Sequence, residues 1–132
     1  MNKIVFINSR SVPFVDMIMK QEKIFETRSR DVLRKLFETG EQFYIAETGK
    51  GKPIVKCSAR IRAIETVYTE TAWNRYRTFH LVPPGSQYDW QTDTKKKVMY
   101  QLDNVTPVPA PFIPPEGKRH GRIWMEYNPE VK

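Results

Sequence analysis

The sequence has a single cysteine and no long apolar run. Cys57 alone excludes an intramolecular disulfide and a cysteine-rich metal framework, and a lone thiol is easiest to reconcile with a reducing cytosol. The apolar run over residues 4–7 is too short for a signal peptide, and no later run approaches membrane-spanning length. We therefore expect a cytoplasmic protein without a membrane partner, and we predict neither a metal nor a cofactor.

Acidic residues are scarce relative to basic ones. The 132 residues include 22 Lys and Arg against 15 Asp and Glu, a formal net charge of +7, and the excess lies mainly in residues 1–66. Such a balance favours polyanions such as nucleic acids. Many small domains are basic for solubility alone, and phosphate contacts carry no base specificity, so the charge indicates a class of partner and nothing finer.

The length bounds the architecture. A chain of 132 residues with 39% hydrophobic content can bury one core without disulfides or a metal, so we predict a single domain over 1–132. Apolar spacing and turn residues predict strands over 3–8, 24–28, 42–47, 54–66, 98–105 and 123–127, and helices over 11–21, 31–38 and 69–81. We expect Ser11 to cap the first helix and Gly40 to end the second.

Five of the ten prolines lie between Pro107 and Pro115. Proline cannot donate to a strand ladder, so we predict an extended, polyproline-like wrap there. Five or six short strands with two or three helices and many turns then predict an α+β fold, a mixed β-barrel that is closed or nearly closed.

Residues 21–30 hold the candidate chemistry. In a strand over 24–28, Glu26 and Arg28 share one face with Ile24. Lys23 falls at the preceding turn, where its long stem can swing the ammonium toward Glu26 although strict alternation points it away. A Lys beside a carboxylate can donate or accept a proton or clamp a phosphate. The alternative is a solvated salt-bridge edge, because Lys, Glu and Arg commonly line exposed strands.

These residues also carry a family resemblance. Asn8-Ser9-Arg10, a helix closing at Met19-Lys20-Gln21-Glu22, and Lys23-Ile24-Phe25-Glu26-Thr27-Arg28 resemble the signature of ASCH domains, with Gln21 where Gly is common. The resemblance covers most of the chain and implies a single ASCH/PUA-like domain. Its fold would be a PUA-like mixed β-barrel of five to six strands flanked by two to three short helices.

The resemblance implies a site at the barrel mouth. We predict Lys23, Glu26 and Arg28 as catalytic residues. For nucleic-acid binding we predict eight further residues: Asn8, Ser9, Arg10, Arg30, Trp73, Tyr100, Arg122 and Trp124. Trp and Tyr side chains can stack on bases while Arg holds phosphate.

Two broad functions follow from the resemblance. ASCH relatives include an amidohydrolase acting on acetylated cytidine, and others are proposed ribonucleases. The amidohydrolase pattern places a nucleophilic Thr three residues after the Lys, where this chain has Glu26. The chain therefore lacks the hydroxyl that acyl transfer by that route needs. Glu26 remains a candidate general base for water or a ribose hydroxyl, with Lys23 and Arg28 stabilising negative charge. Glu65 and Glu70 are candidates for a second carboxylate.

The other function is non-catalytic. A reader or regulatory module would bind RNA or single-stranded nucleic acid, or a nucleotide or modified nucleoside, through the same cleft. A third class is an interaction protein that uses the basic cleft for a protein partner. We favour a nuclease or hydrolase slightly at this stage, because a Lys and a carboxylate this close suit proton transfer.

Overall fold

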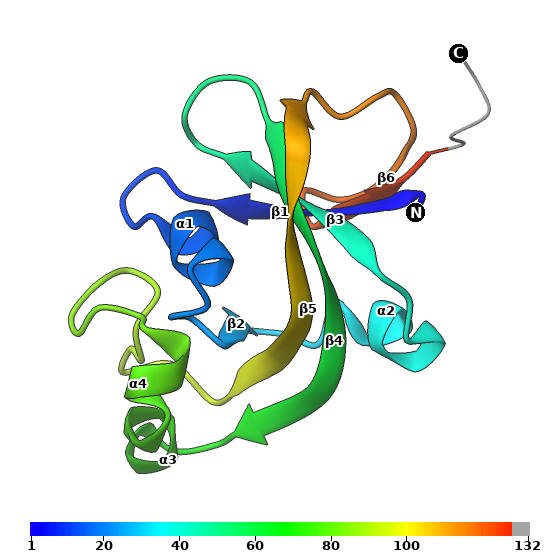
Figure 1. Ribbon diagram of the computed structural model, residues 1–132. Coiled ribbons are helices and arrows are strands. Elements are labelled where there is room, and N and C mark those ends of the chain that lie inside the picture. Colours follow the sequence, from blue (N-terminus) through cyan, green and yellow to red (C-terminus); the bar gives the residue numbers. More distant parts are fainter. Residues whose placement is uncertain (128–132) are drawn as a thin grey trace.

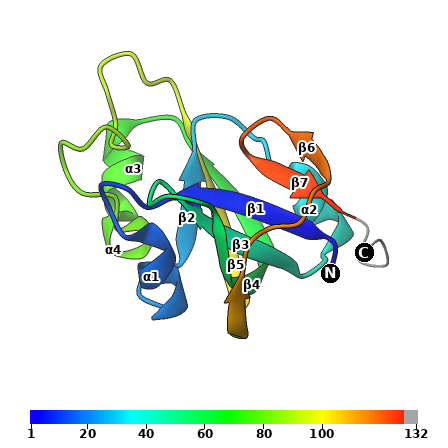
Figure 2. The ribbon, with the colours of Figure 1, turned by 90° about the horizontal axis from the view of Figure 1, so that it is seen from above.

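The computed structural model describes residues 1–127, and its main feature is one seven-stranded mixed sheet (Figures 1 and 2). The strand order is β2-β5-β4-β3-β1-β7-β6. The strands are β1 (Lys3–Asn8), β2 (Phe25–Arg28), β3 (Phe43–Thr48), β4 (Ile54–Val67), β5 (Lys97–Phe112), β6 (Lys118–His120) and β7 (Trp124–Glu126). The helices are α1 (Phe14–Met19), α2 (Arg34–Thr39), α3 (Glu70–Arg75) and α4 (Arg77–His80). The predicted α+β class is confirmed.

The sheet curls without closing into a barrel. Within the described residues, β2 and β6 end the strand order, so no ladder joins them. Register shifts interrupt the long β4–β5 pairing at three points, and bulges of this kind bend and twist a strand. The curl brings β2 close to β1, where an Arg28 Nη2–H donates to the Phe6 carbonyl oxygen over 2.9 Å. A side chain therefore links β2 to β1, two strands that no ladder joins.

The hairpin β3–β4 and strand β1 agree with the sequence pattern. β1 pairs in parallel with β3, and β3 pairs antiparallel with β4, around a tip that contains Gly49 and Gly51. Both glycines have φ of +92°, a conformation that side chains with a Cβ rarely adopt. Gly40 ends α2 in the left-handed conformation, as predicted.

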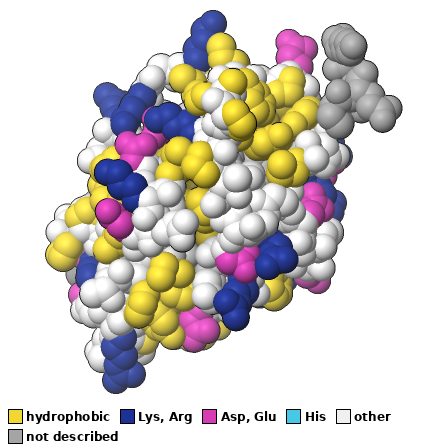
Figure 3. All heavy atoms as spheres, in the orientation of Figure 1, with side chains coloured by type: hydrophobic (Ala, Val, Ile, Leu, Met, Phe, Trp, Pro, Cys, Tyr) yellow, Lys and Arg dark blue, Asp and Glu magenta, His cyan; other side chains and the backbone are white. Residues whose placement is uncertain are grey.

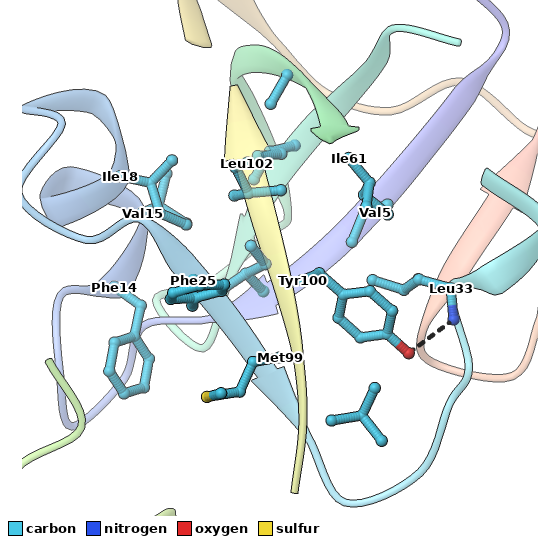
Figure 4. Packing of buried hydrophobic residues seen from close by; sticks show 14 of the residues in the cluster. Val5, Phe14, Val15, Ile18, Phe25, Leu33, Ile61, Met99, Tyr100 and Leu102 are labelled. Carbon is cyan, nitrogen blue, oxygen red and sulfur yellow. Dashed lines mark hydrogen bonds between the residues drawn. The ribbon is translucent and has the colours of Figure 1, made fainter. Parts of the chain in front are cut away.

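The core fills the concave side of the sheet. Figure 4 shows residues of α1, β2 and β5 packed together, with Phe25, Met99 and Tyr100 among them. A smaller apolar cluster of Ile4, Phe6, Ala46, Val55 and Met125 forms around β1, β3, β4 and β7. No helix among the described residues is long and apolar enough to cross a membrane.

Two local predictions are wrong. Pro13, not Ser11, occupies the N-cap of α1 and makes no side-chain cap bond, while the Ser9 hydroxyl accepts the Val15 N–H over 3.3 Å. The helix predicted over 69–81 divides at Tyr76 into α3 and α4. Thr69 does cap α3, since its side chain accepts the Ala72 N–H.

Three of the five prolines of this run, Pro107, Pro109 and Pro111, belong to the sheet rather than to a wrap, and Pro114 and Pro115 follow the end of β5. β5 continues to Phe112, and Pro107 lies opposite Cys57 of β4. Because Pro107, Pro109 and Pro111 are two residues apart, their nitrogens face the same edge of the strand. The other edge keeps its donors, which lets β5 stay paired with β4 on that side.

Candidate functional site

A cavity of about 320 Å³ opens between the C-terminal end of β1 and strand β2. Its volume is at the lower end of the range for small-ligand pockets, roughly 300–1,000 Å³. Three of the predicted site residues line it, namely Asn8, Glu26 and Arg28. The other lining residues are Ile7, Phe14, Thr27, Ser29, Gln87, Tyr88 and Lys97.

Glu26 and Arg28 form one polar wall. An Arg28 Nη2–H reaches Glu26 Oε2 over 3.3 Å, which agrees with the predicted alternation along β2. The Thr27 backbone N–H donates to Glu26 Oε1 over 2.9 Å. The Glu26 side chain is only 8% exposed. A carboxylate held in this way can accept a further hydrogen bond from a ligand or take up a proton.

The end of α1 sets the position of Lys23. The Gln21 N–H donates to the Ile18 carbonyl and the Glu22 N–H to the Met17 carbonyl, the pair of bonds that defines a Schellman motif. Gln21 has a φ of 60°, the left-handed conformation that glycine adopts most easily. This explains why Gly suits the position in the ASCH-like pattern. The Lys23 N–H also donates to the Met17 carbonyl, so the chain turns inward at Lys23.

Lys23 is almost fully buried, with 2% of its surface exposed. Its Nζ donates to the His80 carbonyl oxygen and lies 4.6 Å from the centroid of the Phe14 ring. Burial lowers the pKa of Lys23 to about 8, partly offset by the nearby charge of Glu26. Lys23 does not line the cavity, and Phe14, which does, covers its ammonium group. Its effect on a ligand would therefore act through Glu26 and Phe14.

The pKa of Lys23 gives a stability prediction. Its pKa falls from 10.5 to about 8 on folding, so the unfolded chain binds more protons between these values and stability rises with pH there. We expect Lys23→Met to remove this rise, worth about 3 kcal/mol. Denaturant unfolding of both proteins from about pH 7 to pH 10.5 would measure it. A difference between the two unfolding free energies that stays constant with pH would contradict the prediction.

An aromatic wall faces the polar one. The rings of Phe14 and Tyr88 meet edge to face with centroids 5.4 Å apart. The Lys97 Nζ donates to the Tyr88 carbonyl over 3.0 Å. Tyr88 lies in the loop after α4, which Asp89 anchors by accepting the Trp73 indole N–H over 2.7 Å. The cavity therefore joins two apolar rings with two cations and one carboxylate.

Several predicted nucleic-acid contacts have structural partners away from the cavity. Trp73 is fully buried and stacks on His80 with ring centroids 3.8 Å apart. Tyr100 is fully buried too, and its hydroxyl donates to Asp31 Oδ1 over 2.8 Å, while burial raises its pKa. Trp124 stacks on His120 at the other end of β1.

The remaining predicted contacts lie outside the cavity lining. The Ser9 hydroxyl already accepts the Val15 N–H at the start of α1. The side chains of Arg10, Arg30 and Arg122 are exposed and do not line the cavity. The carboxylate candidates are also elsewhere: Glu65 accepts the Tyr76 hydroxyl, and Glu70 is exposed in the first turn of α3. The roles of all these residues stay predictions.

The sequence pattern did not reveal the aromatic wall. Phe14 fits the apolar spacing of a core helix, and Tyr88 and Lys97 come from segments far from β2 in the chain. The only local signals near it are the Pro-Pro-Gly turn before Tyr88 and the lysine run that ends at Lys97, and neither indicates an aromatic pair. Among residues 1–127, no three His, Cys, Asp or Glu side chains are placed to hold a metal ion.

Comparison with solved structures identifies the fold. The crystal structure of ASCH from Zymomonas mobilis matches with a TM-score of 0.69 and 21% sequence identity, over 97% of this chain and 88% of that chain. Two variants of the same protein match with TM-scores of 0.69 and 0.68 at 20% identity, over 96% of this chain and 88% and 90% of theirs. No protein-family model and no curated protein matches the sequence. The agreement of the curled sheet and the short helices with these structures shows that this chain has the ASCH fold.

Proposed function

We propose that the protein binds a nucleotide, either free or within a single-stranded nucleic acid, with its base in the cavity between β1 and β2. The observation that carries the proposal is the ion-paired, nearly buried Glu26 carboxylate beside an aromatic pair in a cavity of about 320 Å³. A base needs an apolar surface for its faces and polar partners for its edge, and the two walls supply both.

The lining residues suggest a division of roles. Phe14 and Tyr88 would contact the faces of the base, and Glu26 would accept a hydrogen bond from an exocyclic amine such as that of cytosine. Arg28 and Lys97 supply positive charge for a sugar-phosphate group. Asn8 offers a further amide at the β1 side of the cavity.

Hydrolysis of a nucleic acid or a modified nucleoside is the second candidate. This function is favoured because Glu26 lies near the buried Lys23, and burial lowers the pKa of Lys23 to about 8. In that reaction Glu26 would take a proton from water or a ribose hydroxyl, and Arg28 would stabilise the negative charge that develops. Binding has better support, because the Lys23 ammonium donates to the His80 carbonyl and lies outside the cavity lining.

Replacing Glu26 with Gln separates these functions. For a binding protein we expect Glu26→Gln to weaken nucleotide binding by about 1–3 kcal/mol, because the substitution removes one discriminating acceptor. Calorimetric titration with ribonucleoside monophosphates carrying different bases would show the loss for one base above the others. Glu22→Gln, an exposed carboxylate four residues earlier, is the matched control and should bind normally.

The same proteins should be incubated with RNA and single-stranded DNA. We expect retention without products. Cleavage by the unmodified protein that stops in Glu26→Gln, with binding preserved, would establish the hydrolase instead. If no nucleotide or nucleic acid binds, and neither a nucleic acid nor a modified nucleoside such as acetylated cytidine is cleaved, both candidate functions are wrong.

A further inference from the structure

The tip of the β3–β4 hairpin is the strongest basic feature next to the cavity. It comprises residues 49–53 and holds two exposed lysines, Lys50 and Lys52. The parallel pairing of β1 and β3 places Asn8 beside Thr48, and the Ser9 N–H donates to the Thr48 carbonyl over 2.9 Å. The tip therefore starts where β1 ends, at the rim of the cavity.

The tip and the β1 end are packed together, so their spacing is set. A Cβ at Gly49 would lie 2.8 Å from Asn8 Oδ1 and 2.8 Å from the Cβ of Arg10, closer than such atoms approach. The Asn8 side chain also accepts the Arg10 N–H over 2.9 Å. Asn8 lines the cavity, whereas Arg10 is exposed. Arg10 therefore packs against the start of the tip that carries the two lysines.

These cations are weakly neutralised. Glu47 is buried and pairs with Lys56 over 3.0 Å, and its oxygen lies 4.0 Å from Lys50. Arg10 and Lys52 pair with no carboxylate among residues 1–127. Figure 3 shows Lys and Arg side chains gathered at the upper left, where Figure 1 places this tip. Several exposed cations with few carboxylate partners attract the phosphates of a polymer more than one small anion.

We propose that Arg10, Lys50 and Lys52 form a phosphate track that makes the site select a single-stranded polynucleotide over a free nucleotide. The inference rests on the proposed function, because the cavity would hold one base while the track holds the phosphates of the neighbouring nucleotides. Single strands suit such a track, since their backbone bends to follow a groove while a base turns into a pocket.

The test compares short homopolymeric ribo-oligonucleotides with ribonucleoside monophosphates by fluorescence anisotropy across a salt series. For the double variant Lys50→Ala, Lys52→Ala we expect weaker oligonucleotide binding and a salt dependence shallower by about 1.4 in log–log slope, since each phosphate of a single strand that is no longer neutralised lowers the slope by about 0.7. Monophosphate affinity should stay unchanged. The double variant Lys35→Ala, Arg62→Ala removes two exposed charges, one on α2 and one on β4, outside the tip, and should keep the slope.

The outcomes separate the two proposals. Oligonucleotide binding that is no tighter than monophosphate binding, or a slope that the tip variant leaves unchanged, would overturn the track while the cavity proposal stands. If Glu26→Gln loses monophosphate binding while the tip variant keeps the salt dependence of the unmodified protein, the result supports the cavity proposal and contradicts the track. Displacement of the oligonucleotide by polyglutamate as readily as by unlabelled oligonucleotide would assign the tip to acidic proteins instead.

Discussion

Replacing Asp89 with Ala is expected to lower the free energy of unfolding by about 3 kcal/mol. Asp89 Oδ1 accepts the Trp73 indole N–H over 2.7 Å and an Arg77 Nη1–H over 3.0 Å, and Oδ2 accepts the Gly85 N–H over 2.9 Å. The substitution leaves the indole donor of a fully buried Trp without a partner and releases the loop that carries Tyr88. Ligand binding should therefore fall together with stability.

Denaturant unfolding monitored by tryptophan fluorescence measures this change. Asp93→Ala removes an exposed carboxylate from the same loop and serves as the matched control, with a change expected within about 0.5 kcal/mol. Binding is measured well below the unfolding midpoint of the variant, so that a weaker affinity reports the loop and not global unfolding. If the unfolding free energy of Asp89→Ala lies within about 0.5 kcal/mol of that of the unmodified protein, the range typical of surface substitutions, Asp89 does not anchor the loop.

Acidification is expected to destabilise the protein through His80, by about 3 kcal/mol between pH 6.5 and about 4. His80 is fully buried; its Nδ1 accepts the Val82 N–H over 2.9 Å, so the ring is neutral and Nε2 carries the proton toward the Trp73 carbonyl. The pKa of His80 is lowered to about 4, chiefly by burial and in smaller part by the charges of Lys23 and Arg77, while the hydrogen bond to the Trp73 carbonyl and the charge of Asp89 oppose the shift. The unfolded chain takes up its proton near pH 6.5 and the folded chain only near 4. The contribution of His80 to the free energy of unfolding is therefore fully present above pH 6.5 and is lost as the pH falls toward 4.

His80→Asn tests this directly. An Asn oxygen can still accept the Val82 N–H, so the variant keeps that bond while losing the titration and the stack on Trp73. We expect lower stability at neutral pH and a much flatter decline between pH 6.5 and about 4. His120→Asn, at the only other histidine, should retain the decline. The same slope in His80→Asn as in the unmodified protein would assign the acid sensitivity to other groups.

The sequence was most informative where structure depends on near neighbours. The run over Lys3–Asn8 predicted β1, the spacing over 42–47 and 54–66 predicted β3 and most of β4, and Gly40 predicted the end of α2. Alternation predicted that Glu26 and Arg28 share a face, and they form an ion pair. Each of these follows from backbone periodicity or from one residue's conformational freedom, which a short segment already contains.

Predictions from local sequence patterns were incomplete or wrong where contacts between distant segments determine the structure. The proline run suggested an escape from the sheet, but β4 pairs with one edge of β5 beyond Pro107. Strict alternation points Lys23 away from Glu26 but does not say what it contacts, and the Schellman turn at Gln21 directs it under Phe14 toward the His80 carbonyl. The partner in each case lies far away in the chain, so no window of sequence contains the interaction.

Composition was enough to predict a basic excess, and residue spacing was enough to predict an α+β chain with Glu26 and Arg28 on one face of a strand, because spacing is a property of short segments. The family resemblance added Asn8 as a candidate site residue. The tertiary structure was needed to show that these three line one cavity, that Phe14 and Tyr88 form its other wall, and that Trp73 and Tyr100 belong to the interior. The curl of the sheet brings β2 next to β1, and the Asp89 contacts hold a distant loop over the opening. Both depend on contacts between segments far apart in the chain, and a cavity exists only once those segments have packed.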